Sequence, residues 1–137
     1  MRTDDPAADA NGGDLPAYRV ELTEPAEAEV EAAYLGRLRF GQQAADRWYA
    51  GLVRVFGTLS GVPRGFPVAE ESDALGGEVR VFVYGKGGSA YRILYRVIEP
   101  LGGEPGIVRI SHVRHSARRR LTTIEDASEE DAGGMDV

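Results

Sequence analysis

The first patterned stretch of the chain alternates apolar and polar residues. Tyr18, Val20 and Leu22 are separated by Arg19 and Glu21. A period of two places alternate side chains on opposite faces of an extended chain, so this pattern is typical of a short strand with one buried face. We therefore expect a strand at about residues 18–22.

Two stretches with helical periodicity follow this strand. Thr23 offers a capping hydroxyl and Pro25 suits the first turn of a helix, so a helix is expected to begin here and to reach about Phe40. Gly41 interrupts the pattern, and a second apolar stripe at i, i+3, i+4 and i+7 follows. Its members are Ala45, Trp48, Tyr49, Leu52, Val55, Phe56 and Leu59. Two amphipathic helices with so short a link fold back as a hairpin, with Trp48 and Leu52 in the core.

Three more strands are expected in the second half, at residues 78–84, 90–98 and 107–115. Glycine-rich connections of a few residues join them, which favours antiparallel neighbours. Residues 60–77 are rich in glycine and proline and are interpreted as a connection, long for a loop. The predicted fold class is α+β, in the order β-α-α-β-β-β, with a helical hairpin packed on a small antiparallel sheet.

Length and composition define the domain organisation. A chain of 137 residues has room for one core. We expect a disordered acidic tail at 1–16, a folded domain at 17–123 and a second disordered acidic tail at 124–137, because the ends have little to bury. Cysteine is absent, which excludes disulfides and thiolate sites, and no signal peptide or membrane span is recognisable. These features favour a cytoplasmic protein without a membrane partner.

Charge is distributed unevenly along the sequence. The net charge is −6, yet residues 79–123 carry nine basic and two acidic side chains, a local charge of +7. Such asymmetry favours a polyanionic or acidic partner for this half of the chain. The alternative is that the arginines decorate a solvated face of the sheet.

The strand expected at 90–98 carries a candidate anion site. Alternation places Arg92 and Arg96 on one face with Leu94, and the tyrosines Tyr91 and Tyr95 on the other. A pair of guanidinium groups suits phosphates or carboxylates, because each planar fork binds two oxygens. The tyrosines are more simply explained as core residues.

The last strand contains both histidines of the protein, His112 and His115, among arginines. Histidine transfers protons near neutral pH and arginine stabilises phosphate charge, so a metal-free ribonuclease is chemically conceivable. Either histidine could equally have a structural role at the strand end. Two histidines three residues apart point to opposite faces of a strand, so a metal site is disfavoured, and no cofactor is expected.

The order of elements, the segment 91–97 and the segment 108–118 together resemble the RelE/ParE family of bacterial toxins. The likeness spans residues 17–119. It implies a toxin of a type II toxin–antitoxin system that inhibits growth, stabilises plasmids and is neutralised by a cognate antitoxin wrapped around it as a hetero-oligomer.

The resemblance also implies roles for single residues. If the chain is a ribonuclease, its catalytic residues are Arg92, which matches the third-strand arginine, together with His115 and Arg118 at the end of the last strand. For either target, the residues expected to bind it are Arg80, Arg92, Arg96, Arg114, His115 and Arg118.

The family divides by target. Ribosome-dependent ribonucleases of this family commonly add a tyrosine near the C-terminus, and residues 116–137 contain none. The His-x-x-Arg ending and the long helical hairpin resemble the ParE branch, whose members bind and inhibit DNA gyrase. Gyrase inhibition is therefore the preferred interpretation. The alternatives are a ribosome-dependent mRNA endonuclease, with ribosome and mRNA as partners, and an inactive interaction domain of the same fold.

Overall fold

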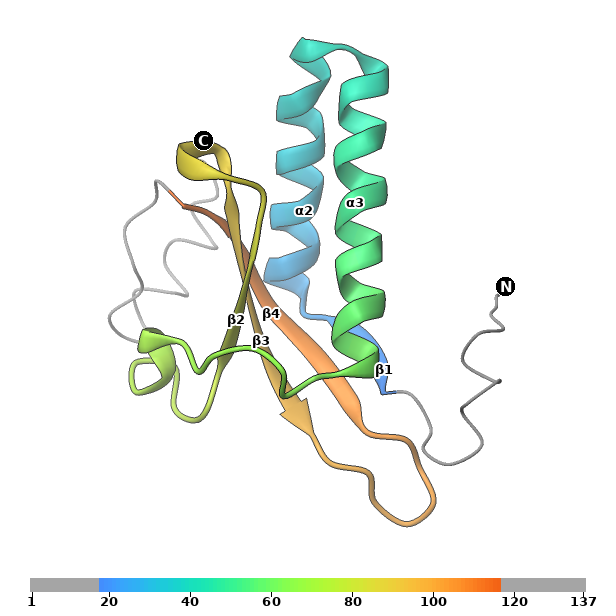
Figure 1. Ribbon diagram of the computed structural model, residues 1–137, viewed down its shortest axis with the longest axis vertical. Coiled ribbons are helices and arrows are strands. Elements are labelled where there is room, and N and C mark those ends of the chain that lie inside the picture. Colours follow the sequence, from blue (N-terminus) through green and yellow to red (C-terminus); the bar gives the residue numbers. More distant parts are fainter. Residues whose placement is uncertain (1–17, 117–137) are drawn as a thin grey trace.

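A computed structural model describes residues 18–116 of the protein. A helical hairpin packs on one face of a four-stranded sheet and extends beyond it (Figure 1). The elements in chain order are β1 (Arg19–Leu22), α2 (Glu24–Arg37), α3 (Gln42–Gly61), β2 (Arg80–Tyr84), β3 (Tyr91–Ile98) and β4 (Ile107–His115). The two predicted acidic tails, at 1–16 and 124–137, lie outside the described residues.

The helices begin where the sequence indicates. Thr23 caps α2, with its side-chain oxygen accepting a hydrogen bond from the Ala26 N–H at 3.2 Å, and Pro25 lies in the first turn. Gly41 separates a short 3-10 turn from α3 and has a φ of 109°, a conformation that glycine adopts without strain. The predicted hairpin is therefore confirmed.

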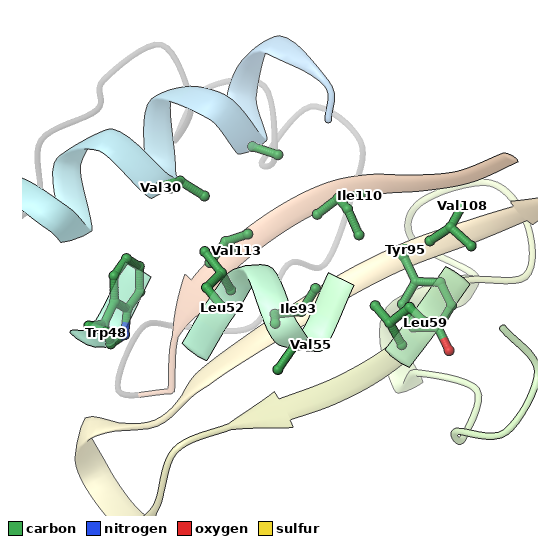
Figure 2. Close-up of a cluster of buried hydrophobic side chains, with 11 residues drawn as sticks. Val30, Trp48, Leu52, Val55, Leu59, Ile93, Tyr95, Val108, Ile110 and Val113 are labelled. Atoms are coloured by element: carbon green, nitrogen blue, oxygen red, sulfur yellow. The ribbon is translucent and has the colours of Figure 1, made fainter. Parts of the chain in front are cut away.

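The main core lies between the hairpin and the sheet. Leu52 is fully buried on α3, and Trp48 is buried one turn before it, as the apolar stripe predicted. Figure 2 shows these side chains beside Val30 of α2 and facing the apolar side chains of the two central strands. Those strand residues are Ile93, Tyr95, Val108, Ile110 and Val113.

The sheet has the order β1-β4-β3-β2 and is mixed. β2, β3 and β4 pair antiparallel, as their short connections predicted, but β1 runs parallel to β4. The predicted α+β class and element order hold, whereas the expectation of a wholly antiparallel sheet is wrong for β1. A helical hairpin, not a tight turn, joins β1 to the rest, so local geometry does not impose an antiparallel neighbour.

The opposite face of the sheet is also covered. The register between β3 and β4 shifts at Leu94/Tyr95, and both side chains are fully buried, on different faces. Tyr95 donates a hydrogen bond from its hydroxyl to the Pro63 carbonyl at 2.7 Å, and burial raises the pKa of this tyrosine. Leu94 packs with Ala69 and Val79 in a second, smaller apolar cluster.

Within residues 18–116, no helix has the length and apolar character needed to cross a membrane.

Candidate functional site

Four arginines face one another across the two central strands. Arg92 of β3 is the register partner of Arg114 on β4, and Arg96 is the partner of Arg109. Tyr91, next to Arg92, packs on the helix side against Trp48, so alternation places the arginines on the face away from the hairpin. The predicted sharing of a face by Arg92 and Arg96 is confirmed.

The segment of residues 66–79, here called the strap, covers this face. It follows α3 and lies on the side of the sheet away from the hairpin (Figure 1). A backbone hydrogen bond from the Val81 N–H to the Pro67 carbonyl, at 2.9 Å, fixes it to the edge strand β2, and one from the Ala69 N–H to the Val79 carbonyl, at 2.6 Å, joins the two ends of the strap. Residues 60–77 were interpreted from the sequence as a connection, and most of that segment forms a layer packed on the sheet.

Glu71 of the strap forms an ion pair with Arg92. The Arg92 Nη2 donates to Glu71 Oε1 at 3.1 Å, and Nη1 donates to Oε2. The Arg92 and Glu71 side chains are 14% and 1% exposed, respectively. Both oxygens of the carboxylate therefore face both terminal nitrogens of the guanidinium, the bidentate arrangement that arginine also makes with phosphate.

Two further arginines are bound by the strap. Arg96 donates from Nη2 to the Leu75 carbonyl. Arg80 donates from Nη1 to the Phe66 carbonyl at 2.7 Å, and its Nη2 lies 2.7 Å from a carboxylate oxygen of Glu78. The alternative interpretation, a solvated face of arginines, is therefore not observed at these positions, because acceptors of the strap contact the guanidinium groups.

Arg114 and His115 lie at the end of β4 on different faces. Arg114 is 2% exposed and has Arg92 as its cross-strand neighbour. His115 packs edge-on against Tyr91, with ring centroids 5.1 Å apart. Arg92 and His115, two members of the predicted catalytic set, thus project to opposite sides of the sheet. The third member, Arg118, lies outside the described residues.

His112 has a structural partner. Its Nδ1 lies 3.2 Å from Oε2 of Glu29 on α2, while Oε1 of the same carboxylate accepts the Val113 N–H at 2.7 Å. This contact ties α2 to the part of β4 beyond its pairing with β1. Among residues 18–116, no group of three or more histidine, aspartate or glutamate side chains is placed to hold a metal ion.

Three aromatic side chains lie near Arg37, the last residue of α2: Trp48, Tyr84 and Tyr91. The Arg37 guanidinium lies over the rings of Trp48 and Tyr91, at 5.5 and 5.9 Å from their centroids. Tyr84 donates a hydrogen bond to the Trp48 carbonyl at 2.7 Å. Burial raises the pKa of Tyr84, and the positive charges of Arg54 and Arg37 partly oppose this. These contacts join the hairpin to β2 and β3.

The helical hairpin exposes large apolar side chains to solvent. They belong to both helices and to the turn between them: Leu35, Phe40, Tyr49 and Val53. All four lie on the hairpin, the element that extends beyond the sheet.

Glu71 and Glu29 are the polar residues that the sequence patterns did not reveal. Glu71 lies in a segment without periodicity, and its partner Arg92 is 21 residues away. The only signal was the length of the connection, since loops of this length are commonly functional. Nothing in the sequence distinguishes Glu29 from the other acids near the start of its helix.

One comparison with known proteins identifies a family, and another finds a similar fold. The family described as "ParE toxin of type II toxin-antitoxin system, parDE" matches residues 20–120. A solved structure titled "Chromosomal ParDE TA system from P. aeruginosa" is similar with a TM-score of 0.54 and 17% identity, over 72% of this chain and 96% of that chain. At this identity the likeness concerns the fold. No curated protein matches the sequence.

Proposed function

The chain belongs to the ParE toxin family of type II toxin–antitoxin systems, and on this premise we propose that it stops growth by binding DNA gyrase without cutting RNA. A cognate antitoxin is its expected partner and neutralises it by forming a hetero-oligomer. The proposal concerns the target and the mode of action within the family.

The closed state of Arg92 is the observation that carries the proposal. A ribonuclease would need this guanidinium free to hold the scissile phosphate, and here Glu71 occupies both of its terminal nitrogens. A ribonuclease would also need a proton-transferring group beside that phosphate, whereas His115 lies on the other face against Tyr91. Binding to a protein target requires neither arrangement.

The helical hairpin gives further support. It extends beyond the sheet (Figure 1), and its exposed apolar side chains include Phe40 and Tyr49. Aromatic side chains are enriched in protein interfaces because they bury a large area at a small entropic cost. A rigid hairpin with such residues suits inhibition by binding.

Plasmid topology in cells tests the proposal. The chain would be expressed from an inducible promoter in bacteria, and topoisomers of a reporter plasmid resolved on a chloroquine gel. We expect induction to relax the plasmid as growth stops, and co-expression of the antitoxin to restore both. A gene with a stop codon in place of Leu52 serves as the control and should change neither. Growth arrest with normal supercoiling and accumulating mRNA fragments would instead support the endonuclease.

A further inference from the structure

Three arginines of the helical hairpin gather around Tyr84, the last residue of β2. Arg47 and Arg54 lie four residues before and three residues after Gly51, so they share one side of α3 with it. A Cβ atom on Gly51 would collide with the Tyr84 hydroxyl oxygen, so this side of α3 lies against Tyr84. Burial raises the pKa of Tyr84, and the positive charges of Arg54 and Arg37 oppose this, which places both guanidinium groups near its hydroxyl. We call Arg37, Arg47 and Arg54 the hairpin patch.

No carboxylate within residues 18–116 forms an ion pair with the hairpin patch. Asp46, the one acid of α3, accepts hydrogen bonds from Tyr34 and Gln42 instead. By contrast, five arginines of the sheet and its connections each pair with a glutamate: Arg19, Arg64, Arg80, Arg92 and Arg109. The hairpin patch is therefore a group of positive charges that the described residues do not balance.

The described part of the chain ends beside the hairpin patch. Tyr84, Tyr91 and His115 are register partners across β2, β3 and β4, and β4 ends at the side of the sheet toward which the hairpin extends (Figure 1). His115 packs on the Tyr91 ring, and the Arg37 guanidinium lies 5.9 Å from the centroid of the same ring. The segment that follows Ser116 therefore starts next to the patch.

The sequence beyond this point carries the opposite charge. Residues 124–137 have six acidic side chains and no basic one: Glu125, Asp126, Glu129, Glu130, Asp131 and Asp136. The first of these acids lies nine residues after Ser116, and nine residues of extended chain span up to about 30 Å. Arg47 and Arg54 are two turns apart, or about 10 Å along α3. The whole patch is therefore within reach of the acidic segment.

We propose that residues 124–137 dock on the hairpin patch, with carboxylates of this segment bound to Arg37, Arg47 and Arg54. A single exposed ion pair contributes little. Here, however, the segment is tethered beside the patch and offers several carboxylates at once, so its effective concentration is high. The contact covers the junction between the hairpin and β2. It goes beyond gyrase inhibition and does not depend on the identity of the target.

A spin label on the acidic segment tests the proposal in the full chain. The protein contains no cysteine, so Ser128→Cys provides a single attachment site. The label should broaden the backbone amide signals of Arg47 and Arg54 in an NMR spectrum, and reduction of the label should restore them. A label on Ala7→Cys, in the other acidic tail, is the control and should leave both signals sharp.

Charge substitutions in the labelled chain identify the contact. The double substitution R47Q/R54Q should remove the broadening at positions 47 and 54. R19Q/R64Q is the matched control, since it removes two exposed arginines that already have glutamate partners, and it should keep the broadening. Raising the salt concentration from about 0.1 to about 1 M shortens the Debye length from about 10 to about 3 Å, and should weaken the broadening.

A mixed sample distinguishes the chain's own segment from that of a second copy. It combines isotope-labelled parent protein with spin-labelled protein that carries no isotope. Broadening in this sample would show that the segment binds another molecule and would overturn the proposal. Sharp signals in the singly labelled chain, or broadening that persists in R47Q/R54Q, would overturn it as well. None of these results depends on gyrase, so they separate this proposal from the proposed function.

Discussion

Glu71 and Arg92 hold opposite charges almost out of water, with side chains 1% and 14% exposed. Removing ions from water is expensive, and the pair offsets this cost only while both partners are present. Loss of one partner leaves a buried charge, so each residue depends strongly on the other. A substitution of Arg92 is therefore expected to lower the stability of the fold, so its effect on target binding must be measured together with its free energy of unfolding.

Arg92→Ala should lower the free energy of unfolding by about 3 kcal/mol, because it leaves the Glu71 carboxylate buried without its ion pair. Arg109→Ala is the control, since its contact with Glu21 is long, at 3.5 Å, and its side chain is 43% exposed. We expect that variant to lose less than about 1 kcal/mol. Urea denaturation measures both, and equal losses would show that the Glu71 pair has no special weight.

Leu52→Ala should cost about 2–5 kcal/mol, because a fully buried leucine leaves a cavity between α3 and the sheet. Val53→Ala provides a neighbouring control, since Val53 is exposed to solvent. Its effect should stay within about 0.5 kcal/mol. Thermal denaturation of the two variants checks the assignment, and a Leu52→Ala variant as stable as the parent would contradict it.

At the scale of elements, local patterns predicted those parts that depend on near neighbours. The stripe through Trp48 and Leu52 predicted α3, and the short glycine-rich turns predicted two antiparallel pairings. The parallel pairing of β1 was missed because its partner, β4, is more than 80 residues away in sequence. The strap was also missed, because the segment that carries Glu71 has no periodic pattern and its partner Arg92 lies 21 residues further along the chain.

The β4 end shows how one side chain joins two elements. β1 pairs with β4 only from Ile107 to Ile110, and beyond this the Glu29 carboxylate accepts the Val113 N–H in place of a strand. The sequence identified the strand but not this replacement, since nothing in the pattern of α2 separates Glu29 from its acidic neighbours.

Glu29→Ala should therefore lower the free energy of unfolding by about 1–3 kcal/mol, the usual cost of leaving a buried donor unsatisfied. It should also speed hydrogen exchange at the Val113 amide. Glu31→Ala, which removes an exposed acid from the same helix, should do neither. Unchanged exchange at Val113 would mean that another acceptor serves this donor.

At the scale of the whole molecule, the sheet separates two layers with different chemistry. The hairpin covers one face with apolar side chains and exposes others to solvent, while the strap covers the arginines on the opposite face. The sequence showed that residues 79–123 are the basic half of the chain, with a charge of +7. It did not predict that much of this charge is bound internally, because the acids responsible lie in an earlier segment.

Supercoiling by purified DNA gyrase, run beside translation-coupled mRNA cleavage on one preparation of the protein, tests the central claim most directly. We predict that the protein prevents gyrase from supercoiling relaxed plasmid, that added antitoxin restores the activity, and that mRNA on translating ribosomes stays intact. Normal supercoiling together with cleaved mRNA would contradict gyrase inhibition as the mode of action.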